Sequence, residues 1–130
     1  RLAAHARALC ADWDVRPPDI DAVAAALSGG NQQKLVVARE LTRPGVTVVV
    51  AAQPTRGVDL AASALIHRRL AAVAAGGVGV LLISADLDEL LGLAHRVLVL
   101  YRGRIAGAVD DPRAADARAR IGALMTGAAA

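Results

Sequence analysis

The sequence predicts an α/β fold in which helices flank a parallel β-sheet and an antiparallel hairpin lies at its edge. Two runs of aliphatic and β-branched residues, 46–51 and 79–84, are typical of strands buried on both faces. Segments with helical periodicity precede, separate and follow these runs, and such alternation is typical of parallel sheets. The chain of 130 residues is long enough for one domain or part of one.

Each element of the first half has a local signal. A helix is expected up to about residue 11, because Pro17-Pro18 prevents it from continuing far. A second helix is expected from about Gly29 to Thr42, where Arg43-Pro44-Gly45 ends it. The strand at 46–51 follows.

The second half continues the alternation. A helix over about 60–75 ends at Gly76-Gly77, and the second strand comes next. Asp86 is the predicted N-cap of a short helix over about 86–93, with Glu89 completing a capping box. Strands over 97–101 and 104–109 flank Arg102-Gly103 as a hairpin. A terminal helix over about 113–125 precedes a Gly-Ala-Ala-Ala tail that is expected to fray.

Composition excludes several classes of protein. Hydrophobic residues make up 55% of the chain, aromatic residues only 2%, and the net charge is +3. Scattered arginines without base-stacking aromatics disfavour nucleic-acid binding. Cys10 is the single cysteine, which excludes an internal disulfide. The sequence has no apolar run near the roughly 18 residues that a membrane span needs.

The most informative motif is the octapeptide at residues 27–34, Leu-Ser-Gly-Gly-Asn-Gln-Gln-Lys. It places two glycines after a serine, directly before a helix-forming run. The first-turn N–H groups of a helix lack internal partners, and the helix dipole adds a partial positive charge there, so such a start attracts anions. Ser28 can cap the helix or contact a phosphate, and glycine lets a ligand approach the backbone. An ordinary Ser-capped helix after a glycine turn is the simpler interpretation of Ser-Gly-Gly alone.

The octapeptide resembles the signature motif of ABC-type ATPases, in the variant found in the second half of tandem ATP-binding proteins of sugar and nucleoside importers. The segments Pro-Thr-Arg-Gly-Val-Asp (54–59) and Ile-Ser-Ala-Asp-Leu (83–87) support the resemblance, which covers about residues 5–125. It implies a C-terminal part of one ATP-binding domain with a partial P-loop NTPase-like sheet, whose N-terminal part is missing. Residues 1–26 would end the helical subdomain, and 27–130 would form the signature helix and the rest of the ATPase core.

The resemblance also implies how ATP is bound. Two halves close head to tail, and the signature helix of one half covers ATP with Mg²⁺ held mainly by the partner half or by the missing part. The residues that would contact this ATP in trans are Ser28, Gly29, Gly30, Asn31 and Gln32. Asp59 would lie in a loop at the seam between the halves.

The chain's own hydrolytic site is predicted to be degenerate. Where the family has Asp-Glu before Pro-Thr, this sequence has Ala52 and Gln53, and Ala85 replaces the histidine that follows the next strand. Alanine cannot hold a metal, and a neutral amide cannot accept a proton. Lys34 is the only lysine and lies in the octapeptide, so no phosphate-cradling loop is present. No catalytic or metal-binding residue is intact, and the fragment alone is predicted to be inactive.

The implied partners are an ATP-binding half, transmembrane permease subunits and, indirectly, an extracytoplasmic substrate-binding protein, at the cytoplasmic face of the membrane. The transported substrate is not encoded in this segment. Two alternatives remain open: a non-catalytic regulatory or scaffold module of an ABC complex, and a non-transport ABC ATPase. Because the predicted strands would have open edges, the isolated chain is expected to be poorly soluble or to dimerise.

Overall fold

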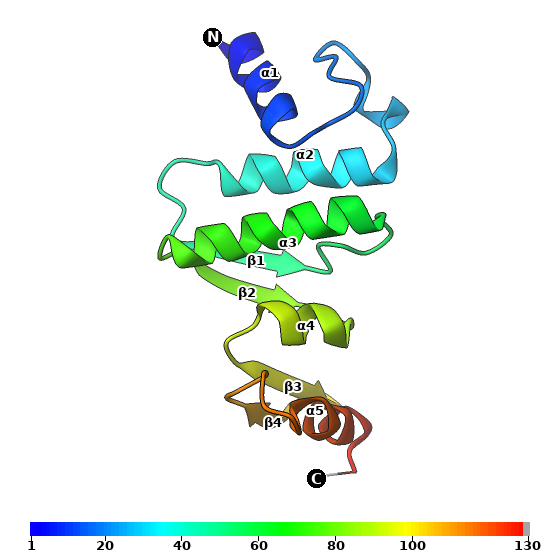
Figure 1. Cartoon of the computed structure of the whole chain (residues 1–130), viewed down its shortest axis with the longest axis vertical. Coiled ribbons are helices and arrows are strands. Elements are labelled where there is room, and N and C mark those ends of the chain that lie inside the picture. Colours follow the sequence, from blue (N-terminus) through cyan, green and yellow to red (C-terminus); the bar gives the residue numbers. More distant parts are fainter. Residues whose placement is uncertain (129–130) are drawn as a thin grey trace. The chain divides into compact units, whose positions relative to one another are not determined.

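The computed structural model describes residues 1–128 and has the predicted α/β class (Figure 1). The chain folds as two compact units, Arg1–Ile83 and the segment from Ser84 onward. Each is described by itself. The predicted subdomain boundary between residues 26 and 27 stays a prediction.

The first unit contains four helical elements and two strands. They are α1 (Leu2–Asp12), a 3₁₀ turn η1 (Ala24–Ala26), α2 (Gly29–Leu41), β1 (Val48–Ala52), α3 (Leu60–Ala75) and β2 (Gly79–Ile83). The predicted helices are present, and the bounds of α3 are those expected. The strand β1 begins two residues later than predicted, and η1 had no recognised signal in the sequence.

The strands β1 and β2 pair in parallel, with Val50 opposite Leu81. On one face of this sheet α3 contributes the buried side chains of Ile66 and Leu70, and α2 lies beside α3 (Figure 1). The prediction that both strands are buried on both faces is wrong. Exposed and half-buried residues alternate along each strand, and Val50 is 63% exposed. An apolar run shows that a strand is suited to burial, but the elements that cover its faces decide whether it is buried.

A separate core is formed by residues at and just after the end of α1, by Leu27 and by the later part of α2. Its buried members are Cys10, Trp13, Val15, Leu27 and Ala38. Trp13 is only 1% exposed and is the largest of them. Leu27 belongs to the octapeptide, so the residue before Ser28 anchors this motif in the core.

The second unit is a hairpin with two helices. It contains α4 (Leu87–Leu93), β3 (Val97–Tyr101), β4 (Arg104–Val109) and α5 (Ala117–Thr126). The core of this unit forms where Val97, Val99 and Val109 pack with Ala117 and Ile121 of α5. The hairpin has the predicted bounds, whereas α5 begins four residues later than expected.

The hairpin was predicted to be an edge of the parallel sheet, but the structure shows no strand pairing between the two, so this prediction is wrong for the described residues. In the described part of the chain, β3 and β4 form a two-stranded sheet of their own. The turn residues Arg102 and Gly103 specify the hairpin locally, but its neighbours in a larger sheet are not a local property. Part of the tail that was expected to fray, residues 129–130, lies outside the described residues.

Candidate functional site

The octapeptide forms the start of α2, as predicted. Ser28 is the N-cap, and its Oγ accepts a 2.9 Å hydrogen bond from Asn31 Nδ2 and a longer one, 3.4 Å, from the Asn31 backbone N–H. Because the Ser28 oxygen accepts both bonds, its hydroxyl proton can be donated elsewhere. Ser28 and Gly29 are exposed, so the helix start is open to a ligand.

Two polar side chains of the octapeptide hold the segment that follows α1. Asn31 Oδ1 accepts a 3.0 Å hydrogen bond from the backbone N–H of Arg16, and Lys34 Nζ donates a 2.8 Å bond to the backbone carbonyl of Asp14. A hydrogen bond from Arg16 lowers the pKa of the Asp14 carboxyl, and the charge of Lys34 acts in the same direction. Lys34 therefore links α2 to the segment that follows α1.

Two glutamines of the octapeptide bind backbone carbonyls. Gln32 Nε2 donates a 2.9 Å hydrogen bond to Leu27, just before the helix. Gln33 Nε2 donates a 2.8 Å bond to the carbonyl of Pro54, in the loop after β1. Asn31 and Gln32, both expected to contact ATP, thus also serve the local fold.

The two glycines of the motif are not required by backbone conformation. Neither Gly29 nor Gly30 has a positive φ angle. A Cβ added at Gly29 would lie 4.0 Å from its nearest neighbour, the carbonyl oxygen of Gly57. One added at Gly30 would lie 3.4 Å from Asp59 Oδ2 and 3.6 Å from Ala62 Cβ, which is ordinary contact. Alanine would therefore fit at both positions. It would also stabilise the helix, because glycine in a helix costs about 0.5–1 kcal/mol relative to alanine.

The loop after β1 lies against this helix start. Ala52 ends the strand, and Gln53 follows with a φ of 50° while its N–H donates a 2.7 Å bond to the Ile83 carbonyl. Asp59 ends the loop as the N-cap of α3, where its Oδ1 accepts a 2.8 Å bond from the Ala62 N–H. The loop is thus held by the sheet at one end and by α3 at the other.

Ala85, the third position predicted to be degenerate, belongs to the second unit. It lies between Ser84, whose Oγ accepts a 3.0 Å bond from the Asp86 N–H, and Asp86, which caps α4 as predicted. Glu89, the other half of the expected capping box, is 3% exposed. Among residues 1–128, no three His, Cys, Asp or Glu side chains are grouped so that they could hold a metal ion.

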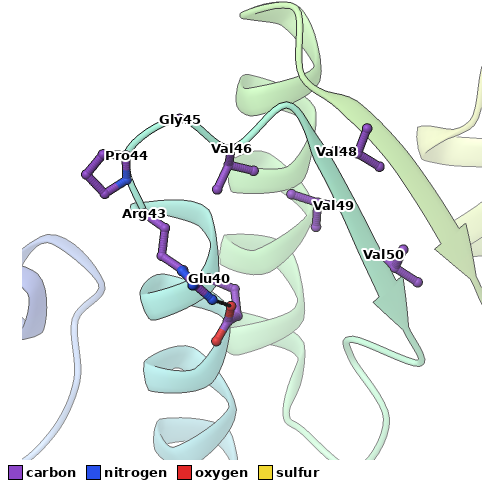
Figure 2. A pocket seen from close by; sticks show the side chains of 8 residues that line it. All are labelled: Glu40, Arg43, Pro44, Gly45, Val46, Val48, Val49 and Val50. Carbon is purple, nitrogen blue, oxygen red and sulfur yellow. Dashed lines mark hydrogen bonds and ion pairs between the residues drawn. The ribbon is translucent and has the colours of Figure 1, made fainter.

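A hollow of about 370 Å³ lies at the opposite end of α2 (Figure 2). Its lining residues are Glu40, Arg43, Pro44, Gly45, Val46, Val48, Val49 and Val50. Arg43 Nη1 and Glu40 Oε2 form a 3.2 Å ion pair on its wall. Its two charged side chains are paired with each other, and it lies at the far end of α2 from the octapeptide. It is not part of the candidate site.

Comparison with known proteins identifies relatives along nearly the whole chain. The chain is 41% identical over 122 residues to the guanosine import ATP-binding protein NupO of Bacillus subtilis, which is 94% of this chain and 23% of that protein. It is 48% identical over 128 residues to a glucose import ATP-binding protein of Haloferax volcanii. This alignment covers 97% of this chain and 23% of that protein. A ribose import ATP-binding protein of Streptomyces avermitilis is 43% identical over 134 residues, 100% of this chain and 26% of that protein. No family model matches the sequence.

This chain is homologous to part of the sugar and nucleoside import ATP-binding proteins. The resemblance that the octapeptide predicted is therefore confirmed. The chain spans about a quarter of the length of these relatives. Among the described helices of this import-protein homologue, none combines the length and apolarity needed to cross a bilayer.

Two residues of the site were missed by sequence reasoning. Asp59 was assigned only to a loop between halves, although an aspartate directly before a helix is a typical N-cap signal. Gln33 was given no role, and its bond to Pro54 spans 21 residues of sequence. No local signal in a single sequence identifies such a long-range pair.

Proposed function

We propose that this chain is the C-terminal part of the second ATP-binding half of a tandem importer ATPase for sugars or nucleosides. In this proposal the start of α2 closes over ATP with Mg²⁺ held by a partner half. The importer would act at the cytoplasmic face of the membrane, with permease subunits and an extracytoplasmic substrate-binding protein. The names and similarity of the relatives support the transporter class.

The observation that carries the closing role is the pair of glycines at the start of α2. Neither their φ angles nor their neighbours exclude a Cβ, so nothing within the described chain explains why alanine is absent. An anion that approaches the backbone N–H groups of the first turn does explain it, because a Cβ would obstruct that approach. The exposed Ser28 hydroxyl lies at the same place and can donate to a phosphate oxygen.

The site on this half is proposed to bind nucleotide without useful turnover. Ala52, Gln53 and Ala85 offer neither a carboxylate nor an imidazole at the positions that the family uses. Loss of a general base lowers a rate by about 10²–10⁴-fold, and loss of a metal ligand adds to that. The working site would be the one that α2 completes on the partner, with Asp59 near the seam.

The test is ATP hydrolysis by the complete importer in membranes, with wild type compared with Ser28→Asp and Ser28→Arg. Aspartate caps a helix as well as serine, so Ser28→Asp keeps the fold while its charge repels a phosphate. Loss of hydrolysis in both variants, with an unchanged melting temperature for Ser28→Asp, is the expected result. Unchanged hydrolysis would instead favour a non-catalytic scaffold module. The matched control is Arg39→Met, an exposed residue near the other end of α2.

A further inference from the structure

We propose that Gln33 is a positioning residue that locks the ligand-facing start of α2 to the loop at residues 53–59, so that both move as one body. This inference rests on the proposed closing role of α2 and assigns a task to a residue that does not itself face the ligand. Its basis is the 2.8 Å hydrogen bond from Gln33 Nε2 to the Pro54 carbonyl.

The Gln33 bond connects a helix to an anchored loop. Pro54 is buried, and a buried carbonyl that loses its partner costs free energy. The loop is fixed at its start by the bond from the Gln53 N–H to the Ile83 carbonyl, and at its end by Asp59 capping α3. A displacement of Pro54 is therefore transmitted to the sheet and to α3.

At Gly29 and Gly30 the helix start approaches this loop without an α2 side chain. Gly29 lies next to the Gly57 carbonyl, and Gly30 lies next to Asp59 and Ala62. Glycine contributes no side chain to these contacts. Such contacts allow α2 to slide or rotate by small amounts. A side-chain hydrogen bond fixes both distance and angle, so the Gln33 bond can set the position of the helix start relative to Pro54.

Two other polar side chains of α2 bind a different segment. Asn31 and Lys34 hold Arg16 and Asp14, which follow α1. Without Gln33, the helix start would follow the α1 segment rather than the loop next to β1. The ligand-facing groups of α2 and the loop that carries the degenerate Gln53 would then lose their fixed relation.

The test uses four variants of the complete importer. Gln33→Met keeps the length of the side chain and removes the donor, whereas Gln33→Lys keeps a donor. Ser28→Asp reports on the proposed function in the same preparation, and Arg39→Met is the surface control. For each variant, kcat and KM for ATP are measured at a temperature at which circular dichroism shows complete folding.

The expected result is a kcat lowered about tenfold in Gln33→Met, with KM changed less than about twofold, because a lost hydrogen bond to a buried carbonyl has this magnitude. Gln33→Lys should retain kcat within about twofold. If Gln33→Met has wild-type kcat while Ser28→Asp is inactive, the positioning role is overturned and the closing role stands. If Ser28→Asp is active, both fail.

A merely structural glutamine would give a different pattern. The melting temperature would then fall in Gln33→Met, and the kcat of the folded protein would be unchanged, which also overturns the proposal. Should Gln33→Met not fold, Gln33→Glu is compared with Gln33→Lys, since each variant introduces one unit of charge. Only the lysine can donate to Pro54, so equal kcat in this pair would contradict the inference.

Discussion

The guanidinium of Arg69 lies 5.0 Å from the centre of the Trp13 ring, so a cation from α3 covers an indole at the end of α1. The same guanidinium donates to the Asp12 backbone carbonyl at 2.6 Å and pairs with the Asp12 carboxylate at 2.7 Å. Trp13 Nε1 is buried and has no hydrogen-bond partner within residues 1–128. Arg69 therefore joins the two helices through both charge and aromatic contact.

Removing Arg69 is expected to destabilise the first unit more than a typical surface change does. Arg69→Ala should lower the free energy of unfolding by about 1–3 kcal/mol, because it removes a cation–π contact and leaves a helix-terminal carbonyl without its donor. Arg69→Lys should recover part of the loss, since lysine lacks the planar, forked donor set. Urea unfolding followed by circular dichroism measures both. Equal stability of Arg69→Ala and wild type would show that the cluster contributes nothing.

Substituting Gly29 by alanine should separate stability from activity. The position has room for a Cβ, so Gly29→Ala is expected to raise the free energy of unfolding by about 0.5–1 kcal/mol. In the complete importer the same variant should lower ATP hydrolysis, because the methyl group obstructs a phosphate at the helix start. Thermal unfolding and steady-state hydrolysis are the two measurements. A variant that is both more stable and fully active would remove the main support for the closing role.

The open face of the parallel sheet should cause self-association. The exposed fractions of Val48, Val50, Leu81 and Ile83 lie between 48% and 65%, and these aliphatic residues are on the face that α3 does not cover. Replacing Val50 and Leu81 together by threonine keeps strand propensity and lowers surface apolarity. Light scattering after size exclusion should show a shift towards monomer.

The matched control for this experiment is Val49→Thr, on the half-buried face of the same strand. It should lower stability without improving solubility. If the wild-type chain is monomeric at about 100 μM, a concentration at which exposed apolar surface and unpaired strand edges promote aggregation, the prediction fails.

The Glu40 carboxylate is expected to contribute stability that disappears in acid. Hydrogen bonds from Arg39 and Arg43 lower its pKa in the folded state. A lowered folded-state pKa gives stability that is present above the unfolded value, about 4.3, and is lost as pH falls through the folded value. The unfolding free energy of wild type should thus approach that of Glu40→Gln below about pH 4. The effect is expected to be small, because the Glu40 carboxylate is exposed. A difference in unfolding free energy between the two proteins that does not change with pH would contradict the prediction.

Local signals predicted the elements of this fold well. Gly76-Gly77 marks the end of α3 and Arg102-Gly103 the turn of the hairpin, and both have the expected places. The burial of β1 was not predictable, because it depends on which elements cover its faces. The same holds for the hairpin, whose pairing partners in a sheet are set by tertiary structure.

The candidate site was predictable where it depends on the octapeptide and not where it depends on packing. Ser28 and the glycines follow from a helix-start pattern, and they occupy the start of α2. The link from Gln33 to Pro54 and the contact of Trp13 with Arg69 join residues far apart in sequence. Spacing along the chain carries no information about such pairs, so only the three-dimensional structure reveals them.

The long-range ties of α2 limit how the octapeptide can be used outside this protein. Its side chains bind residues 14–16 on one side and Pro54 on the other. An isolated peptide of this helix would lose all of these partners, and helices of about 12–15 residues are marginal in water. The motif therefore cannot be transplanted as a free-standing anion-binding peptide, and a scaffold intended to display it must also supply an acceptor in place of Pro54 and a backbone segment in place of residues 14–16.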